Sequence, residues 1–317
     1  MYNKFVAAGE RVLRRTSTVD APWTIVEGVD EAYRSLTVAT AIRDAVREAL
    51  ARSGTATVKK SAPPPKAVTA ANTPRQATTP TILSSLDMQQ KVSKKDFGER
   101  LEKLQGRLNL LQRKAQAKNI STILVFEGWD AAGKGGAIRR ITRALDARSY
   151  QVIPIAAPTD EERAHHYLWR FWRHLSRAGR LTIFDRSWYG RVLVERVEGF
   201  ASEHEWRRAY TEIDEFEDQL VDHGTVLVKY WIHITQDEQL RRFKEREKEK
   251  YKQWKLTVED WRNRAKWPDY ERAVNEMVER TSTRGAPWTV VEGNDKYFAR
   301  LKVLKTLCNS LADAIER

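Results

Sequence analysis

A glycine-rich segment with one lysine is the part of this sequence best suited to chemistry. Gly128 and the pair Gly133–Lys134 stand at the spacing of a phosphate-binding loop. Glycines let backbone N–H groups converge on an anion, and a lysine beside them neutralises phosphate charge. We predict phosphate binding by Gly133, Lys134, Gly135 and Gly136, with the N–H groups of residues 132–136 as the cradle. A glycine-rich turn that binds nothing is the alternative, and the coincidence of apolar strand, four glycines and lysine argues against it.

Two aspartates are suited to hold a metal ion near these phosphates. Phosphate loops commonly place Ser or Thr after the lysine as a Mg²⁺ ligand, and this chain has Gly135 there. Asp130, inside the loop, can supply the missing oxygen. Asp185 ends the apolar run 181–184, and an acid at the carboxyl end of a buried strand suits a metal site. We therefore predict Mg²⁺, with Mn²⁺ as a substitute, on Asp130 and Asp185. Capping of the next turn is the alternative for Asp185.

Arginines surround both segments. A guanidinium group offers a planar fork of donors that matches phosphate oxygens. Arg186, which follows Asp185, is expected to neutralise charge on the bound phosphate. Further phosphate contacts are predicted for Arg139, Arg191, Arg241 and Arg242. The last two belong to a highly charged stretch from 239 to 254, for which we favour a mobile basic lid over a simple solvated helix face.

The elements that must position these residues alternate along the chain. Strands are predicted at 122–126, 151–156, 181–184, 225–234 and 287–294. Helices are predicted from 95 to about 111, then at 135–147, 159–178 and 203–222, and after 295. Such alternation favours an α/β fold with a three-layer parallel sheet. The phosphate loop then follows the first strand, and Asp185 ends the third.

Composition limits the class of protein. The 317 residues carry a net charge of +13, which indicates a polyanionic partner. Cys308 is the lone cysteine, which excludes an internal disulfide and fits a reducing compartment. No apolar run reaches membrane-spanning length, and the N-terminus lacks a signal-peptide core. We expect a cytoplasmic protein without a membrane partner.

An internal repeat joins the two ends of the chain. Residues 15–30 match residues 280–295 at 12 of 16 positions without gaps. We interpret residues 1–51 as the C-terminal end of a preceding repeat domain, with a closing strand at 23–27 and a helix at 31–51. An independent N-terminal module is less favoured, because one strand and one helix cannot close a core.

The first copy differs from the second where phosphate chemistry needs cations. Glu31 stands in place of Lys296, and Ser35 in place of Arg300. The first copy also lacks a phosphate loop, so we expect one nucleotide-phosphate site in the chain.

A proline-rich segment separates the two parts. Half of the ten prolines fall between 52 and 92, among Ala, Thr, Ser and Lys. Such composition buries too little apolar surface to offset the entropy of ordering, so we predict a disordered linker at 52–92. The domain that carries the phosphate loop is then 93–317, with the lid at about 240–266.

Several separated motifs, taken together, resemble the second polyphosphate kinase family. They are Gly128-Trp-Asp-Ala-Ala-Gly-Lys-Gly-Gly136, Phe184-Asp-Arg-Ser-Trp-Tyr-Gly-Arg191, Trp254-Lys-Leu-Thr257, Asp260-Trp261 and Ala286-Pro-Trp-Thr-Val-Val-Glu-Gly-Asn-Asp-Lys296. The resemblance extends from about residue 96 to the end. It implies a thymidylate-kinase-like P-loop fold with a helical lid. The tandem arrangement and Trp129 are similar to the branch that acts as polyphosphate:AMP phosphotransferase.

The resemblance implies Mg²⁺-dependent, direct in-line transfer of a terminal phosphoryl group from inorganic polyphosphate to AMP. The catalytic residues would be Asp130, Lys134, Asp185 and Arg186. Three alternatives remain: a polyphosphate-dependent kinase that makes ATP from ADP, an ATP-dependent nucleoside monophosphate kinase, and a basic protein that binds nucleic acid or another polyanion without catalysis. We expect no nucleic-acid partner, because aspartates beside the loop would repel its backbone, and we expect a homodimer or homotetramer.

Overall fold

The computed structural model of the chain describes residues 1–55 and 80–317. The chain divides into two units, Met1–Gln76 and Ala77–Arg317, and each is described by itself. None of the described helices is long and apolar enough to cross a membrane.

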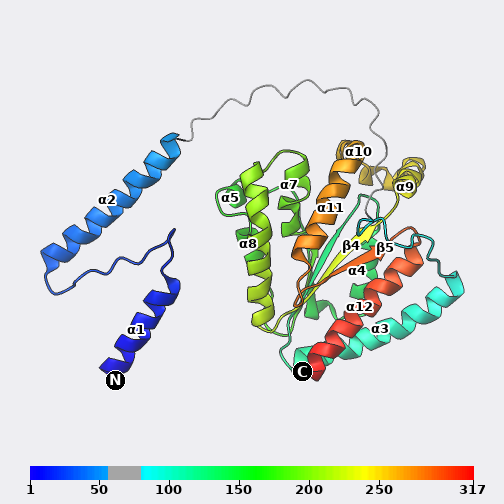
Figure 1. Ribbon diagram of the computed structural model, residues 1–317. Helices are drawn as coiled ribbons and strands as arrows, with labels where there is room; N and C mark the ends of the chain where they lie inside the picture. Colours follow the sequence, from blue (N-terminus) through cyan, green and yellow to red (C-terminus); the bar gives the residue numbers. More distant parts are fainter. Residues whose placement is uncertain (56–79) are drawn as a thin grey trace. The chain divides into compact units, whose positions relative to one another are not determined.

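A five-stranded parallel sheet forms the centre of the second unit (Figure 1). The strands are β1 (Thr122–Gly128), β2 (Tyr150–Pro154), β3 (Leu181–Asp185), β4 (Val226–His233) and β5 (Trp288–Glu292). They lie in the order β2-β3-β1-β4-β5, and every neighbouring pair is parallel. The central strands β1, β3 and β4 are almost wholly buried, as expected for strands covered on both faces. The predicted α/β class, the five strands and their direction are confirmed.

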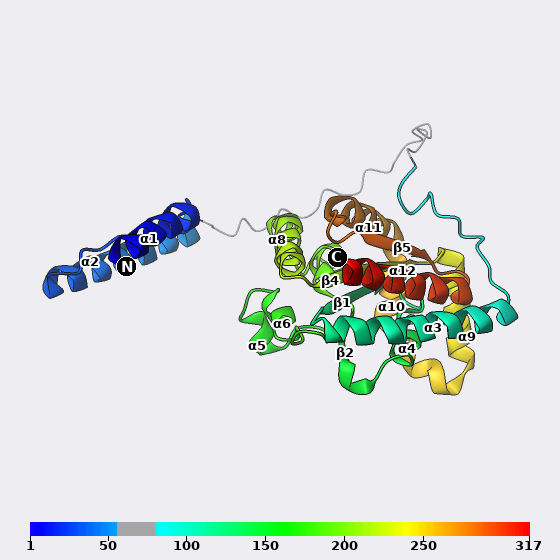
Figure 2. The ribbon, with the colours of Figure 1, turned by 90° about the horizontal axis from the view of Figure 1, so that it is seen from below.

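Helices cover both faces of this sheet, and Figures 1 and 2 show them in two views. The helices α3 (Lys94–Ala117), α4 (Lys134–Thr142) and α12 (Lys296–Glu316) pack together in one group. The helices α7 (Val194–Val197), α8 (Glu203–Asp222) and α11 (Trp267–Thr281) pack together in another. Side-chain caps fix where the long helices begin: Ser93 accepts from Asp96 N, and Asp295 accepts from Tyr297 N and Phe298 N.

The segment after β4 forms the predicted lid region. It contains α9 (Gln236–Lys248), the 3₁₀ helix η3 (Lys250–Lys255) and α10 (Val258–Ala265). Thr257 and Asp260 make a capping box at the start of α10. The helices α9 and α10 lie near the carboxyl end of β4 (Figure 1).

The helix predicted at 159–178 is wrong beyond its first turn. The capped start at Thr159 is confirmed, but the chain forms only α5 (Asp160–Arg163) and α6 (Trp169–Trp172). Its aromatic side chains pack in several directions, and no single helix can satisfy all of them. Phe171 lies edge-on to Phe184 and Trp188 in the core, while Trp169 stacks on His165 at the surface. Tertiary packing here overrides the local pattern.

Three short helical turns complete the unit: η1 (Ala147–Ser149), η2 (Trp188–Arg191) and α7.

The first unit contains α1 (Tyr2–Thr16) and α2 (Glu31–Thr55). The strand predicted at 23–27 is wrong for this structure, because no other strand lies in the described part of this unit to complete a ladder. Trp23 is 56% exposed, whereas its counterpart Trp288 in β5 is 8% exposed. The interpretation of residues 1–51 as the end of a repeat domain stays a prediction.

The predicted linker ends earlier than residue 92. Residues 80–93 lead into α3 through turns, and the Leu83 side chain is buried in the core of the second unit. Its backbone N–H donates to Asn275 Oδ1 on α11 over 3.1 Å. Residues 80–92 therefore belong to the folded unit, because Leu83 supplies apolar surface that the composition of the segment obscures. The rest of the predicted linker, residues 56–79, lies outside the described residues.

Candidate active site

The loop between β1 and α4 has the backbone that its glycines predict. Gly128 and Gly133 adopt φ angles of 150° and 109°, which strain any residue with a side chain. A Cβ atom at Gly128 would also lie 2.5 Å from the carbonyl oxygen of Ile232 in β4. Gly133 is the N-cap of α4. The loop thus turns sharply at the end of the central strand and feeds directly into a helix N-terminus.

Some backbone N–H groups of this loop already donate to carbonyl groups of the loop itself. Ala132 N donates to Trp129 O over 3.0 Å, and Gly136 N donates to Gly133 O over 2.9 Å. Among the described residues, the N–H groups of Gly133, Lys134 and Gly135 have no backbone or side-chain acceptor. The predicted cradle of residues 132–136 therefore narrows to its three central N–H groups.

Lys134 is the first residue of α4, and its side chain folds back along the loop. Its Nζ donates to the carbonyl oxygens of Gly128 over 2.6 Å and Trp129 over 3.3 Å. The ammonium group is thereby held at the carboxyl end of β1, next to the three unengaged N–H groups. This arrangement of one cation and converging amides is suited to bind phosphate oxygens.

The carboxylates of Asp130 and Asp185 fit a magnesium site completed by phosphate. Asp185 ends β3, and Phe126 of β1 pairs with it in the sheet, four residues before Asp130. In the described part of the chain, Asp185 makes no side-chain hydrogen bond, and no group of three or more acidic, His or Cys side chains could hold a metal. Mg²⁺ commonly uses one or two carboxylates and takes its other ligands from phosphates and water. The residues present suit that pattern, and the assignment of Mg²⁺ to them stays a prediction.

Arg186 follows Asp185 in the chain, and its side chain contacts Asp130. Its Nη2 lies 3.3 Å from Asp130 Oδ1, and its backbone has φ of 69°, held by an N–H bond to Phe126 O. Partial desolvation lowers the pKa of Arg186, but the negative charges of Asp130, Glu127 and Asp185 outweigh this and raise it. A left-handed conformation in a residue other than glycine is unusual and occurs often at functional sites. Here it directs the guanidinium group over the loop.

Sequence reasoning missed Glu127, which lies beneath the loop. This carboxyl is 6% exposed and accepts a hydrogen bond from Ser187 Oγ over 2.8 Å. Burial raises the pKa of Glu127 to about 7, although the Ser187 hydrogen bond and the charges of Lys134 and Arg186 oppose the rise. Glu127 ties the end of β1 to the segment that follows Arg186.

Glu127 should make the stability of the protein depend on pH. Because its folded pKa lies above the ordinary 4.5, its contribution is complete below about pH 4.5 and is lost as the pH rises through 7. The loss amounts to about 3 kcal/mol. In Glu127→Gln this dependence disappears. The free energy of unfolding of the variant, measured in urea, should therefore rise relative to that of the wild type between pH 5 and 7.5. For Glu102→Gln, an exposed change on α3, the curve of unfolding free energy against pH should run parallel to that of the wild type. A parallel curve for Glu127→Gln as well would contradict the raised pKa of Glu127.

The lid reaches Asp130 through a residue that the sequence did not single out. Asn263 Nδ2 on α10 donates to Asp130 Oδ2 over 2.9 Å. The buried Gln239 on α9 donates to the carbonyl oxygen of Asp130 over 3.1 Å. Asn263 stands within the predicted lid, but nothing in the sequence indicates that its partner is 133 positions away. One side-chain amide thus binds the carboxylate of Asp130 and the other binds its backbone carbonyl group.

Arg242 lies at the loop but is committed to the protein itself. Its Nη1 donates to the carbonyl oxygens of Ala131 and Ala132, its Nη2 to those of Gly293 and Asn294, and its Nε to Glu238. These bonds use all five N–H donors of the guanidinium group. Arg242 therefore clamps the phosphate loop to the loop after β5, and phosphate binding by it would require exchange of these contacts.

Three other predicted arginines lie apart from the loop. Arg241 pairs with Glu238 and Glu245 on the exposed side of α9. Arg191 pairs with Glu195 over 3.1 Å and lies over the ring of Tyr167, in a small cavity that includes Arg163, His166 and Arg208. Arg139 is exposed in the last turn of α4. Their roles in phosphate binding stay predictions that no contact of the loop supports.

Trp129 anchors the loop to the helix behind the lid. Its ring stacks on Trp267 of α11, with centroids 3.6 Å apart and planes 5° apart. Its Nε1 donates to His233 Nδ1 over 3.0 Å, and burial lowers the pKa of His233 to about 4, which keeps that imidazole a neutral acceptor. The loop is thus held rigidly at its second residue, and a movement of α11 would move it.

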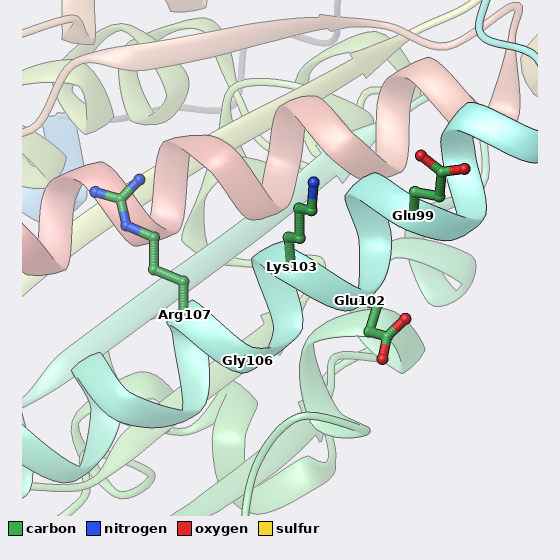
Figure 3. Close-up of a pocket in the computed structure, with 5 residues that line it drawn as sticks. All are labelled: Glu99, Glu102, Lys103, Gly106 and Arg107. Carbon is green, nitrogen blue, oxygen red and sulfur yellow. The ribbon is translucent and has the colours of Figure 1, made fainter.

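A separate groove lies on the outer side of α3 (Figure 3). Its lining comes from one helix only, namely Glu99, Glu102, Lys103, Gly106 and Arg107. Two acids and two bases line the groove, so their formal charges cancel and give no preference for an anion. It carries none of the features of the loop and is not the candidate site.

Comparisons with known proteins identify the family of the chain. A family model described as Polyphosphate kinase 2 (PPK2) matches residues 91–317. A polyphosphate:AMP phosphotransferase of Pseudomonas syringae pv. tomato is 52% identical over 316 residues, which is the whole of this chain and 62% of that protein. An ADP-polyphosphate phosphotransferase of Rhizobium meliloti is 43% identical over 68% of this chain and 71% of its own length.

Solved structures agree with the fold. A polyphosphate kinase 2 structure from Arthrobacter aurescens TC1 has a TM-score of 0.70 and 36% identity, over 73% of this chain and 85% of that one. This chain spans 62% of the length of the Pseudomonas syringae relative, so the activity of the longer protein is not transferred to it directly.

Proposed function

We propose that this chain, which belongs to the polyphosphate kinase 2 family, transfers a terminal phosphoryl group from inorganic polyphosphate to AMP and so makes ADP. The observation that carries the proposal is the arrangement at the carboxyl ends of β1 and β3. There Lys134 and three unengaged N–H groups lie beside two aspartates and Arg186. The similarity to polyphosphate:AMP phosphotransferases supports the choice of donor and acceptor.

The side chains at the site would act by binding and charge neutralisation. Lys134 and the N–H groups of residues 133–135 would hold oxygens of the reacting phosphate, and Arg186 would meet charge that develops on it. Mg²⁺ on Asp130 and Asp185 would supply further neutralisation and draw the phosphate oxygens together. Transfer of this kind requires alignment more than covalent chemistry. No residue need form a phosphorylated intermediate.

The choice of donor is tested by supplying polyphosphate or ATP, each alone, with AMP and Mg²⁺. We expect ADP only with polyphosphate. ADP formed from ATP alone would instead identify a nucleoside monophosphate kinase.

The acceptor needs its own test, because family members named for ADP are also similar. With polyphosphate as donor, AMP and ADP are compared at equal concentration. We expect a higher kcat/KM for AMP; a preference for ADP would assign the chain to the activity that makes ATP.

Asp185→Asn tests the metal assignment. The amide keeps the size of the side chain but removes the charge that binds a hard cation, so the Mg²⁺ concentration for half-maximal rate should rise at least tenfold. The measurement is initial rate against Mg²⁺ at saturating substrates. Asp313→Asn, an exposed change on α12, serves as the charge-matched control. An unchanged Mg²⁺ requirement in Asp185→Asn would remove Asp185 from the metal site.

A further inference from the structure

A partly buried arginine lies beside the phosphate loop without a partner. Arg300 of α12 points at the first turn of α4, where its Nη2 lies 3.3 Å from the position that a Cβ on Gly136 would take. Within residues 1–55 and 80–317, no hydrogen bond or ion pair engages its side chain. Desolvating a charged group without a partner costs free energy, so this placement needs an explanation.

A second arginine increases that cost. Arg140 of α4 lies beside Arg300, and its Nη1 donates only to the carbonyl oxygen of Gly136, over 3.3 Å. Burial and the charges of Arg140 and Arg242 lower the pKa of Arg300 to about 10, against the opposing effects of Tyr297 and Asp295. Burial, with the charges of Arg143 and Arg139, also lowers the pKa of Arg140. The fold thus holds like charges together where a single acid would relieve them.

A third cation extends the group toward solvent. Lys296 is exposed one helical turn before Arg300 on α12, at the i, i+4 spacing that places side chains on one helix face. Arg242 adds positive charge here, but its donors are used by carbonyl groups and Glu238. Of the four cations Arg140, Arg242, Lys296 and Arg300, the donors of Arg242 are used, whereas Arg140, Lys296 and Arg300 keep donors for an anion.

We propose that Arg140, Arg300 and Lys296 form a subsite that binds the part of a linear polyphosphate chain distal to the phosphate held by the loop. This inference rests on the proposed function and specifies the donor side of that site. Gly136 brings the subsite directly against α4, and its missing side chain leaves room for the Arg300 guanidinium group. A chain with a charge on every phosphate can meet all three cations, whereas the adenosine of ATP carries no negative charge to place there.

The internal repeat supports this assignment independently. The first copy has Glu31 where Lys296 stands and Ser35 where Arg300 stands, although 12 of the 16 residues before and including the shared aspartate are identical. The residues that build β5 are thus largely kept in both copies while the two cations are not, so the sequence of this strand does not require Lys296 and Arg300.

The test compares Arg300→Gln with Lys305→Gln, which removes the same charge from an exposed position on α12. Binding of long-chain polyphosphate to the full chain is measured directly, without turnover. We expect the Kd to rise about tenfold for Arg300→Gln, the loss of one charge-assisted contact, and to stay constant for Lys305→Gln. The Kd of AMP should not change.

Thermal unfolding adds a second readout. Because Arg300 is repelled by its neighbours, Arg300→Gln should melt no lower than wild type, whereas loss of a structural arginine would lower the Tm. Equal losses of polyphosphate affinity in both variants would reduce the effect to net charge, and weaker AMP binding would place Arg300 on the acceptor side; either result overturns the proposal. Unchanged polyphosphate binding in Arg300→Gln, with transfer intact, overturns the subsite and leaves the proposed function. If polyphosphate binding depends on Arg300 but no phosphoryl transfer to AMP is detected, the proposed function fails and the subsite stands.

Discussion

Replacing Lys134 with alanine is expected to lower kcat/KM by about 10²- to 10³-fold, the scale of losing one preorganised donor to developing charge. The Nζ of Lys134 is held by the loop's own carbonyl oxygens, at Gly128 and Trp129. The ammonium group therefore stands in position before substrate arrives, and its contribution to the transition state costs little reorganisation. The measurement is steady-state phosphotransfer from polyphosphate to AMP.

The same variant should remain folded. Lys134 makes two hydrogen bonds to carbonyl groups at a partly exposed position, so its loss should cost about 1 kcal/mol or less of unfolding free energy. Lys103→Ala, in the groove on α3, removes an equal charge and should keep full activity. If Lys103→Ala instead lost activity to the same degree, net charge or the α3 groove would govern turnover. An active Lys134→Ala would leave the phosphate loop without its assigned cation.

The parts of this site that the sequence predicted are those encoded locally. A buried strand followed by glycines at fixed spacing specifies both the turn and the φ angles of Gly128 and Gly133. Asp185 was predictable because the carboxyl ends of parallel strands share one edge, which needs only the strand and its direction. Strand limits agreed to within a few residues for the same reason, since a fully buried strand reads as a short apolar run.

The parts that were missed depend on contacts between distant segments. An arginine-rich stretch does not reveal that Arg242 donates to four carbonyl groups, and the repeat does not reveal that Arg300 lies beside Gly136. Asn263 and Asp130 meet across the lid, and no local pattern encodes that pairing. Glu127 was hidden inside a strand, where an acid is uncommon and its meaning depends on Ser187 of a neighbouring segment.

Replacing Lys229 with methionine is expected to give the largest loss of stability, about 3 to 5 kcal/mol. Lys229 lies in β4 and is fully buried with Glu217 of α8, its Nζ 2.6 Å from Glu217 Oε2. The ammonium group also donates to Tyr189 Oη over 2.9 Å and to Thr281 O over 2.7 Å, which uses all three of its donors. Methionine fills similar volume but leaves the carboxylate buried and uncompensated. Urea unfolding at pH 7 measures the loss.

Adding Glu217→Gln to Lys229→Met separates the cost of the unpaired buried carboxylate from the cost of the lost hydrogen bonds. Glu217 Oε1 accepts from Trp188 Nε1 over 2.9 Å and from Tyr189 Oη over 2.7 Å, and a glutamine keeps an acceptor for both. Lys229→Met with Glu217→Gln should therefore recover most of the lost stability, because no buried charge remains. Failure to recover would show that the bonds of Lys229 to Tyr189 and Thr281, rather than the charge balance, carry the stability.

The double variant also tests how the core positions the site. Trp188 and Tyr189 follow Arg186 and Ser187 directly, so the buried network fixes the segment that carries Arg186 to the sheet. If Glu217 positions that segment mainly through neutral hydrogen bonds, the refolded double variant should keep kcat within about twofold of wild type, since a shift of Arg186 would cost far more. A stable double variant with a low kcat and unchanged KM would instead assign the ion pair itself a positioning role in transfer.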